Sequence, residues 1–277
     1  MESVLDVPEG RLRSFVRGSG PTLVLIAGGR GDATRTEALA NHLADRYTVL
    51  TYDRRGLSGS TTSAPAETLA THADDVSRLL GRVTGEPIHV YGTSIGALIA
   101  LELAATNPGR LGVVIAHEPP VTQLLPMSQQ RAARQDLLDV EDKFLTEGVA
   151  AALERFAKVI DVDPADREAD VEIASGGPHQ ASNAEFFLTH DLPLLRRHAV
   201  DLAALKASPA RIVAGVGQTS GSIWPHRCAT LLADELAVPV EEFPGGHNGY
   251  AYRPRATADR IHHVIQGTFN QRTESRP

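Results

Sequence analysis

Short apolar runs alternate with helical segments along this chain, and this alternation limits the fold more than any other feature. Strand-like runs occur at residues 11–18, 22–28, 47–53, 88–93, 111–118, 211–217 and 238–244, with a weaker one at 2–8. Helical periodicity occurs at Thr34–Arg46, Pro65–Leu80, Ala97–Thr106, Ile223–Leu236 and Pro254–Phe269. Several of the strand-like runs are continuously apolar, as is typical of strands covered on both faces. The pattern predicts an α/β fold with a mostly parallel, eight-stranded sheet flanked by helices.

The alternation stops once, between residues 121 and 190. No strand-like run occurs there, and helix-prone segments such as SQQRAARQDLLDVEDKFL fill the interval. About 70 residues are too many for a simple connection inside a compact domain. We therefore predict that residues 1–120 and 191–277 form the core and that residues 121–190 form an inserted helical lid.

Charge and composition argue against several functions. The chain is 42% hydrophobic and carries a formal net charge of -7, which does not favour binding to nucleic acid or to an anionic membrane. The single cysteine, Cys228, cannot form an internal disulfide, and the first residues, MESVLDVPEG, do not resemble a secretory signal. We expect a cytoplasmic protein that binds neither nucleic acid nor membranes, and the sequence leaves a homodimer open.

One strand-to-helix joint carries a serine between two glycines. Residues 88–104 read IHVYGTSIGALIALELA, and Ser94 lies where the strand-like part ends. A G-x-S-x-G match arises by accident in roughly one protein in ten of this size, so the evidence comes from its position. A sharp turn there exposes the hydroxyl, and the helix N-terminus offers free N–H groups to a developing negative charge. We predict that Ser94 is a nucleophile; a helix-capping serine is the alternative.

A serine nucleophile needs a base, and His247 is the best placed of the eleven histidines. It lies in the glycine-rich loop FPGGHNGY, directly after the last strand-like run. Most other histidines fall within predicted helices or strands. We therefore predict that His247 is the base, with a solvated loop histidine as the alternative.

Together these features resemble the α/β-hydrolase family across nearly the whole chain. The strand order, the G-x-S-x-G turn, the segment LTYDRRGLSGS after the fourth strand, the insertion after the sixth and the late loop histidine carry the resemblance. It implies a Ser-acid-His triad in that chain order, an oxyanion hole, and no metal or organic cofactor. It also implies that Asp53 and Arg54 hold loops around the site without reacting.

The acid departs from the commonest pattern of that family. The loop after the seventh strand, GVGQTSGS, contains no carboxylate. Glu118 lies after the sixth strand, in VVIAHEPPV, and zearalenone lactonases and haloalkane dehalogenases are similar in placing a glutamate there. We predict Glu118 as the triad acid, with Asp191 as the second choice; a surface glutamate at a strand end is the alternative for Glu118.

The resemblance also suggests where the substrate binds. It implies that the backbone N–H groups of Gly29 and Ile95 form the oxyanion hole, although a glycine run is also typical of a plain tight turn. We expect an apolar pocket made by the lid and by the start of a late helix. The proposed lining residues are Leu124, Met127, Phe144, Phe156, Phe186, Phe187 and Trp224. Ordinary packing of the lid helices explains the same spacing.

The predicted reaction is hydrolysis of a carboxylic ester or lactone of an apolar small molecule through an acyl-enzyme. A ligand receptor or a non-hydrolytic enzyme of the same fold is the alternative. Residues 22–53 also look like a dinucleotide-binding unit, but Thr34 stands where that fingerprint needs its third glycine, which argues against an oxidoreductase.

Overall fold

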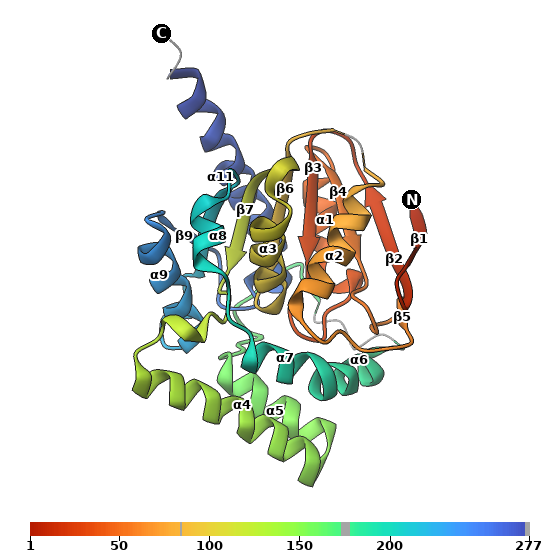
Figure 1. The fold of residues 1–277 in the computed structure, drawn as a ribbon, viewed down its shortest axis with the longest axis vertical. Coiled ribbons are helices and arrows are strands. Elements are labelled where there is room, and N and C mark those ends of the chain that lie inside the picture. Colours follow the sequence, from red (N-terminus) through yellow and green to blue (C-terminus); the bar gives the residue numbers. More distant parts are fainter. Residues whose placement is uncertain (84, 173–177, 275–277) are drawn as a thin grey trace.

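A twisted sheet lies in the middle of the protein with helices on both of its faces (Figure 1). The computed structural model describes residues 1–83, 85–172 and 178–274. The strands are β1 (Glu2–Val7), β2 (Gly10–Arg17), β3 (Thr22–Ile26), β4 (Thr48–Tyr52), β5 (Thr61–Thr62), β6 (Ile88–Thr93), β7 (Leu111–His117), β8 (Arg211–Gly217) and β9 (Val240–Phe243). Their order across the sheet is β1-β2-β4-β3-β6-β7-β8-β9, and β5 pairs with β2.

The sheet is antiparallel at one edge and parallel elsewhere. β2 runs antiparallel to β1 and β4, whereas all pairs from β4 to β9 along this order are parallel. The predicted α/β-hydrolase fold with a mostly parallel sheet flanked by helices is therefore confirmed. The described sheet has nine strands and not eight, because two-residue β5 adds to the predicted set. So short a strand has no apolar pattern by which the sequence could reveal it.

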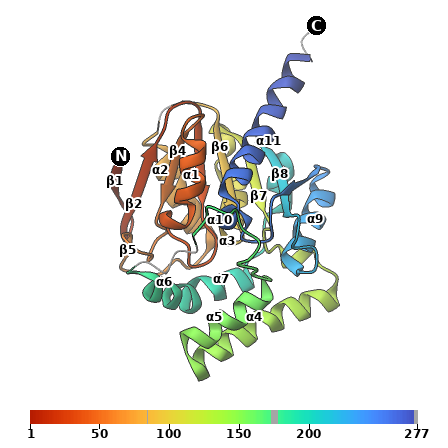
Figure 2. The same ribbon diagram turned by 180° about the vertical axis from the view of Figure 1, so that it is seen from behind.

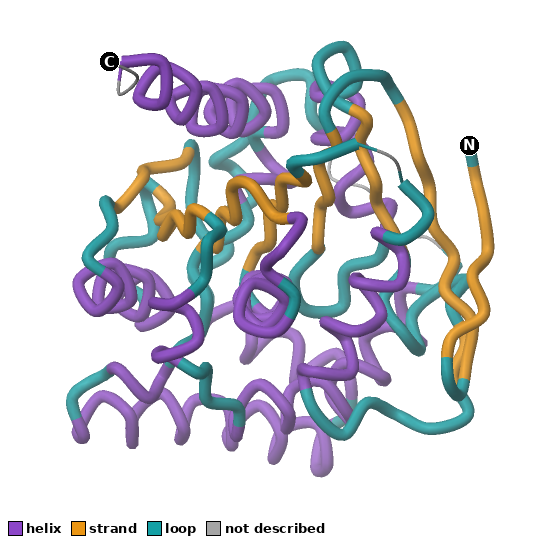
Figure 3. Tube along the Cα trace, turned by 45° about the horizontal axis from the view of Figure 1, so that its top comes forward, coloured by secondary structure: helices purple, strands orange, loops and turns teal. Residues whose placement is uncertain are grey.

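The helices form layers on the two faces of the sheet. On one face lie α1 (Glu37–Leu43) and α11 (Pro254–Glu274), which pack on each other (Figure 2). On the other face lie α2 (Leu69–Leu80), α3 (Ile95–Thr106), α8 (Leu202–Ala207) and α9 (Trp224–Leu236). A short helix, α10 (Gly249–Tyr252), precedes α11, and 3-10 turns span Ala33–Thr36, Pro108–Arg110 and Thr122–Leu124. Figure 3 shows the strands as a central layer surrounded by these helices.

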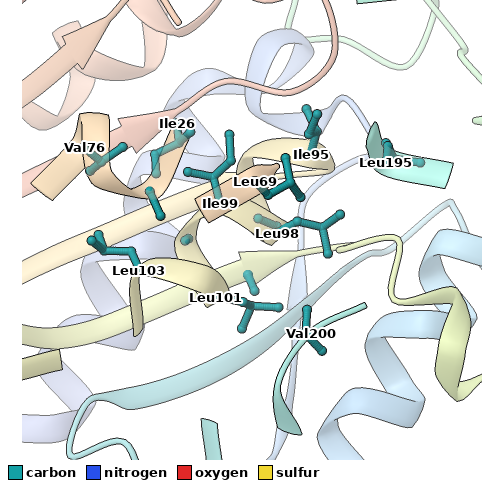
Figure 4. Close-up of a cluster of buried hydrophobic side chains, with 14 of the residues drawn as sticks. Ile26, Leu69, Val76, Ile95, Leu98, Ile99, Leu101, Leu103, Leu195 and Val200 are labelled. Atoms are coloured by element: carbon teal, nitrogen blue, oxygen red, sulfur yellow. The ribbon is translucent and has the colours of Figure 1, made fainter. Parts of the chain in front are cut away.

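Helix α3 is buried along most of its length. Its side chains Leu98, Ile99 and Leu101 are almost fully shielded from solvent and lie in one apolar cluster with Leu69 and Val76 of α2 (Figure 4). Because a helix that is apolar on all sides must lie inside the protein, this packing fixes the start of α3 relative to the sheet. The serine that precedes α3 is therefore held on a rigid support.

A helical layer lies beneath one end of the sheet, in the interval between β7 and β8 (Figures 1 and 2). It contains α4 (Met127–Glu147), α5 (Val149–Val159), α6 (Gln180–Phe186), a π-helical turn (Phe187–Asp191) and α7 (Leu192–Arg197). The predicted lid, residues 121–190, covers the first four of these, and α7 continues the layer beyond residue 190. Residues 173–177 of the predicted lid lie outside the described ranges.

Candidate active site

Ser94 occupies a strained turn between β6 and α3. Its φ of 55° and ψ of -122° are unusual for a residue with a side chain, and such a conformation costs on the order of 1–3 kcal/mol. The flanking glycines explain how the turn closes. A Cβ on Gly92 would lie 2.3 Å from the carbonyl oxygen of Gly96, and a Cβ on Gly96 would lie 2.3 Å from the carbonyl oxygen of Ile26. The G-x-S-x-G pattern is thus required by close backbone contact on both sides of Ser94.

His247 follows β9 and is oriented by Glu118. The Nδ1 atom of His247 lies 2.7 Å from Oε2 of Glu118, and both side chains are almost completely buried. The other ring nitrogen, Nε2, has no hydrogen-bond partner among the described residues. His247 and Ser94 line the same cavity. One nitrogen is therefore held by a carboxylate, and the other makes no hydrogen bond to any described residue.

Glu118 stands at the end of β7 with a φ of 46° and no exposed surface. Its Oε1 atom accepts a hydrogen bond of 2.8 Å from the backbone N–H of Gly217 and another from the hydroxyl of Ser220. The Nδ1 atom of His226 lies 3.5 Å from the same oxygen. Burial alone would raise the pKa of Glu118, but the hydrogen bonds from His226 and His247 outweigh burial and hold that pKa well below its usual range. Glu118 therefore stays ionised beside His247.

The loop after β8 supports this acid. It lacks a carboxylate, as the sequence indicated, but it supplies the Gly217 N–H and the Ser220 hydroxyl. Neither group, nor His226, was predicted as part of the site. A signal was present, because a loop that supplies no acid but contains serine and glycine is suited to donating hydrogen bonds to an acid from the neighbouring strand.

Asp191, the second choice for the acid, lies in a different contact. Its Oδ2 atom is 2.7 Å from Nη1 of Arg54, and its Oδ1 atom is 3.7 Å from Nε2 of His72. All three side chains are at most 1% exposed. Burial raises the pKa of Asp191, but the Arg54 charge and the His72 contact outweigh it, so the pKa is lowered. The structure thus places Glu118, and not Asp191, against His247.

Gly29 and Ile95, the residues predicted for the oxyanion hole, lie close to Ser94. Ile95 is the first residue of α3, and Gly29 follows β3 with a φ of 39°. A Cβ on the preceding residue, Gly28, would lie 3.2 Å from Cβ of Ser94, so this loop runs directly against the serine. The guanidinium of Arg54 donates a hydrogen bond to the carbonyl oxygen of Gly29 and fixes the loop.

Asp53 also holds loops, as the family resemblance implied. Its carboxylate accepts hydrogen bonds of 3.0 Å from the backbone N–H groups of Ala33 and Gly59. Burial is the largest influence on Asp53 and raises its pKa. The pair Asp53 and Arg54 therefore ties the loop after β4 to the loop after β3.

The cavity at Ser94 has a volume of about 210 Å³. Of the seven predicted lining residues, Phe156 and Phe187 line it, with ring centroids 5.3 Å apart. The other five do not line it: Leu124, Phe144 and Trp224 pack against the apolar core, Met127 is 65% exposed, and Phe186 contacts His190. Helical spacing could not separate them, because apolar side chains also hold the lid helices together and onto the core.

The cavity is lined by apolar and by polar side chains. The inserted helical layer, including the segment directly after α5, contributes the apolar side chains of Leu153, Phe156, Ile160, Val162 and Phe187. The core contributes polar side chains that the sequence analysis did not assign to the site: Arg30, Arg35, Asn248, Tyr250 and Tyr252. All five lie within a few residues of Gly29 or His247 in the sequence, and this proximity was the available signal.

Helices of the described ranges include none that is both long enough and apolar enough to span a bilayer.

Comparisons with known proteins agree with this fold. A family model described as "Alpha/beta hydrolase family" matches residues 23–260. The uncharacterized hydrolase YraK of Bacillus subtilis (strain 168) is 34% identical over 268 residues, which cover 95% of each chain. An esterase from Thermogutta terrifontis superposes with a TM-score of 0.73 at 20% identity, over 96% of this chain and 98% of that one. An esterase from Exiguobacterium antarcticum gives 0.74 at 15% identity, over 96% and 100%. Because the family model covers most of the chain and the Bacillus relative nearly all of it, the protein belongs to the α/β hydrolase family.

Proposed function

We propose that this hydrolase cleaves a carboxylic ester or lactone of a small molecule through an acyl-enzyme on Ser94. The observation that carries the proposal is the 2.7 Å contact between Glu118 and Nδ1 of His247, which leaves Nε2 without a hydrogen-bond partner in the described residues, on a side chain that lines the same cavity as Ser94. A carboxylate held in this way orients the imidazole and stabilises the imidazolium that forms during reaction. The match to a relative described as a hydrolase supports a hydrolytic reaction.

The proposed steps use only side chains and backbone groups of this site. The hydroxyl of Ser94 attacks the carbonyl carbon while its proton passes to Nε2 of His247. The N–H groups of Gly29 and Ile95 donate hydrogen bonds to the oxyanion. His247 then gives the proton to the leaving alkoxide oxygen. Water, deprotonated by His247, attacks the acyl-enzyme, and release of the acid restores Ser94.

An ester or lactone fits this site better than an amide does. An alkoxide leaves a tetrahedral intermediate more readily than an amine, so the chemical step is easier for an oxygen leaving group. The apolar side chains that the lid contributes, among them Phe156 and Phe187, would contact the hydrocarbon part of the substrate. Leu124, Met127, Phe144, Phe186 and Trp224 are not part of this proposal, because they lie away from the cavity.

The first test is intact mass after incubation with a fluorophosphonate. We expect one adduct on the wild type, none on Ser94→Ala, and one on the control Ser128→Ala, whose serine is exposed on the lid. Absence of an adduct on folded wild type would contradict the proposal. An adduct without turnover of any ester or lactone would favour a ligand receptor of the same fold.

A further inference from the structure

Two arginine side chains, Arg30 and Arg35, line the cavity that contains Ser94 and His247. Both side chains are partly buried, and no carboxylate of the described residues pairs with either guanidinium. Other partly or fully buried arginines near the site do have such partners, as Arg54 has in Asp191 and Arg55 in Asp75. The cavity therefore contains positive charge that the protein itself does not neutralise.

The surroundings of Arg30 make its positive charge costly. Burial lowers the pKa of Arg30, and the neighbouring charge of Arg35 lowers it further. The pKa of Arg35 is raised, first by Tyr250 and against the effect of burial. Guanidinium groups stay protonated at any pH at which a protein is folded, so two like charges face one space. An anion bound between them would relieve both the desolvation and the repulsion.

The second cavity that these arginines border does not supply the missing anion. It has a volume of about 380 Å³ and is also lined by Asp32, Glu37 and Asp53. Those carboxylates already have partners: Asp32 accepts from Thr34 and Ser58, Asp53 accepts from backbone N–H groups, and Glu37 pairs with Arg17. Neutral donors leave the charges of Asp32 and Asp53 in place, but no described carboxylate forms an ion pair with Arg30 or Arg35, and none is among the main influences on their pKa values. The two guanidinium groups are thus available to an anion in the cavity at Ser94.

We infer that the substrate of this site carries a carboxylate, which Arg30 and Arg35 bind while Ser94 attacks the ester. The inference rests on the proposed function and adds the class of substrate: a monoester of a dicarboxylic acid, or a lactone with an acid group. Guanidinium groups recognise carboxylates with paired hydrogen bonds, and Tyr250 and Tyr252 line the same cavity as the two arginines. Since Arg30 directly follows Gly29, the carboxylate would lie a short chain away from the reacting carbonyl.

The test compares two esters that differ only in charge, 4-nitrophenyl hydrogen adipate and 4-nitrophenyl methyl adipate. We expect the wild type to hydrolyse the anion with a kcat/KM at least about tenfold higher, as one charge-assisted contact allows. In Arg30→Gln and Arg35→Gln this ratio should fall about tenfold, through a higher KM for the anion. Arg17→Gln removes a nearby guanidinium that does not line the Ser94 cavity, and it should leave the ratio unchanged.

Each contrary result has a distinct meaning. Equal kcat/KM for the two esters in the wild type would overturn the carboxylate inference and leave the proposed function standing. An equal loss on both esters in the arginine variants would also overturn it, because the arginines would then act on the oxyanion or on the fold. If a Gln variant has a lower melting temperature than the wild type, Arg30→Lys, which keeps the positive charge, should recover part of the preference in kcat/KM for the anionic ester.

Labelling of Ser94, which needs no turnover of an ester, tests the carboxylate inference separately from the proposed function. Adipate should slow fluorophosphonate labelling of Ser94 in the wild type but not in Arg35→Gln. If neither ester reacts, labelling that is independent of adipate overturns the carboxylate inference. If Ser94 is not labelled at all, the proposed function fails, and the inference fails with it.

Discussion

Glu118 lies directly after β7, whereas the loop after β8, where the commonest family pattern has its acid, contains no carboxylate. Its carboxylate has one oxygen on His247 and the other on Gly217 and Ser220, so both oxygens have partners. The sequence predicted this residue from its place after a strand and from a family resemblance. It could not reveal Ser220 or His226 as partners, because those contacts depend on how the loop after β8 folds over the end of β7.

Glu118→Gln should lower kcat far more than it lowers stability. Glutamine has the same size and still accepts from Gly217, but it cannot stabilise an imidazolium on His247, so we expect a loss of roughly 10³- to 10⁴-fold. Ester hydrolysis and thermal melting measured on the same preparation check this. The exposed lid residue in Glu154→Gln is the control and should change neither. Near-normal turnover in Glu118→Gln would remove Glu118 from the triad.

At the scale of elements, three segments meet at Arg54: the loop after β4, the loop after β3 and the π-helical turn between α6 and α7. Arg54 contacts the carbonyl of Gly29 and the carboxylate of Asp191. The charged side chains of Arg54 and Asp191 are both buried. The sequence predicted the strands and the Ser94 turn, because local apolar runs and glycines determine them. The family resemblance indicated that Arg54 holds loops, but the sequence did not predict its pairing with Asp191 or the place of Arg30 and Arg35 in the cavity, since these contacts join segments that are distant in the sequence.

Arg54→Leu and Asp191→Leu should each destabilise the protein by about 3–5 kcal/mol, because each leaves a buried charge without its partner. The double variant should lose less than the sum of the two, and chemical denaturation of all four proteins measures the coupling. The exposed pair Arg78 and Asp74 is the control, with an expected coupling below about 1 kcal/mol. Additive losses at Arg54 and Asp191 would show that the two side chains do not act as a pair.

At the scale of the whole molecule, buried histidines make the stability depend on pH. His117 lies on β7 with no exposed surface, next to the rings of Tyr91 and Phe243. Burial lowers the pKa of His117 from 6.5 to about 4. Between pH 6.5 and about pH 4, His117 is protonated in the unfolded chain but neutral in the folded protein. Its neutral form therefore contributes fully above pH 6.5, and stability is lost as the pH falls from 6.5 to 4.

His117→Phe should reduce the acid sensitivity of the fold. At pH 4, protonation of His117 in the unfolded chain lowers the free energy of unfolding of the wild type by on the order of 3 kcal/mol. The variant has no histidine at this position and does not lose this stability. Unfolding free energies at pH 7 and pH 4 should therefore differ by less in the variant. His263→Gln, at an exposed histidine of α11, is the control and should keep the wild-type difference. The same difference in His117→Phe and wild type would contradict this account.

The parallel pairing of β7 with β8 joins segments on either side of the insertion, with Val113 beside Arg211. Ser94 and Glu118 precede that junction in the chain, whereas His247 follows it. Such long-range pairing forms slowly, because the chain loses the entropy of closing a long loop before the new contacts can stabilise the pair. The activation of Ser94 that we propose requires all three residues, so we expect it to appear only after β7 and β8 have paired, and the rate at which Ser94 gains reactivity during refolding would report on that pairing.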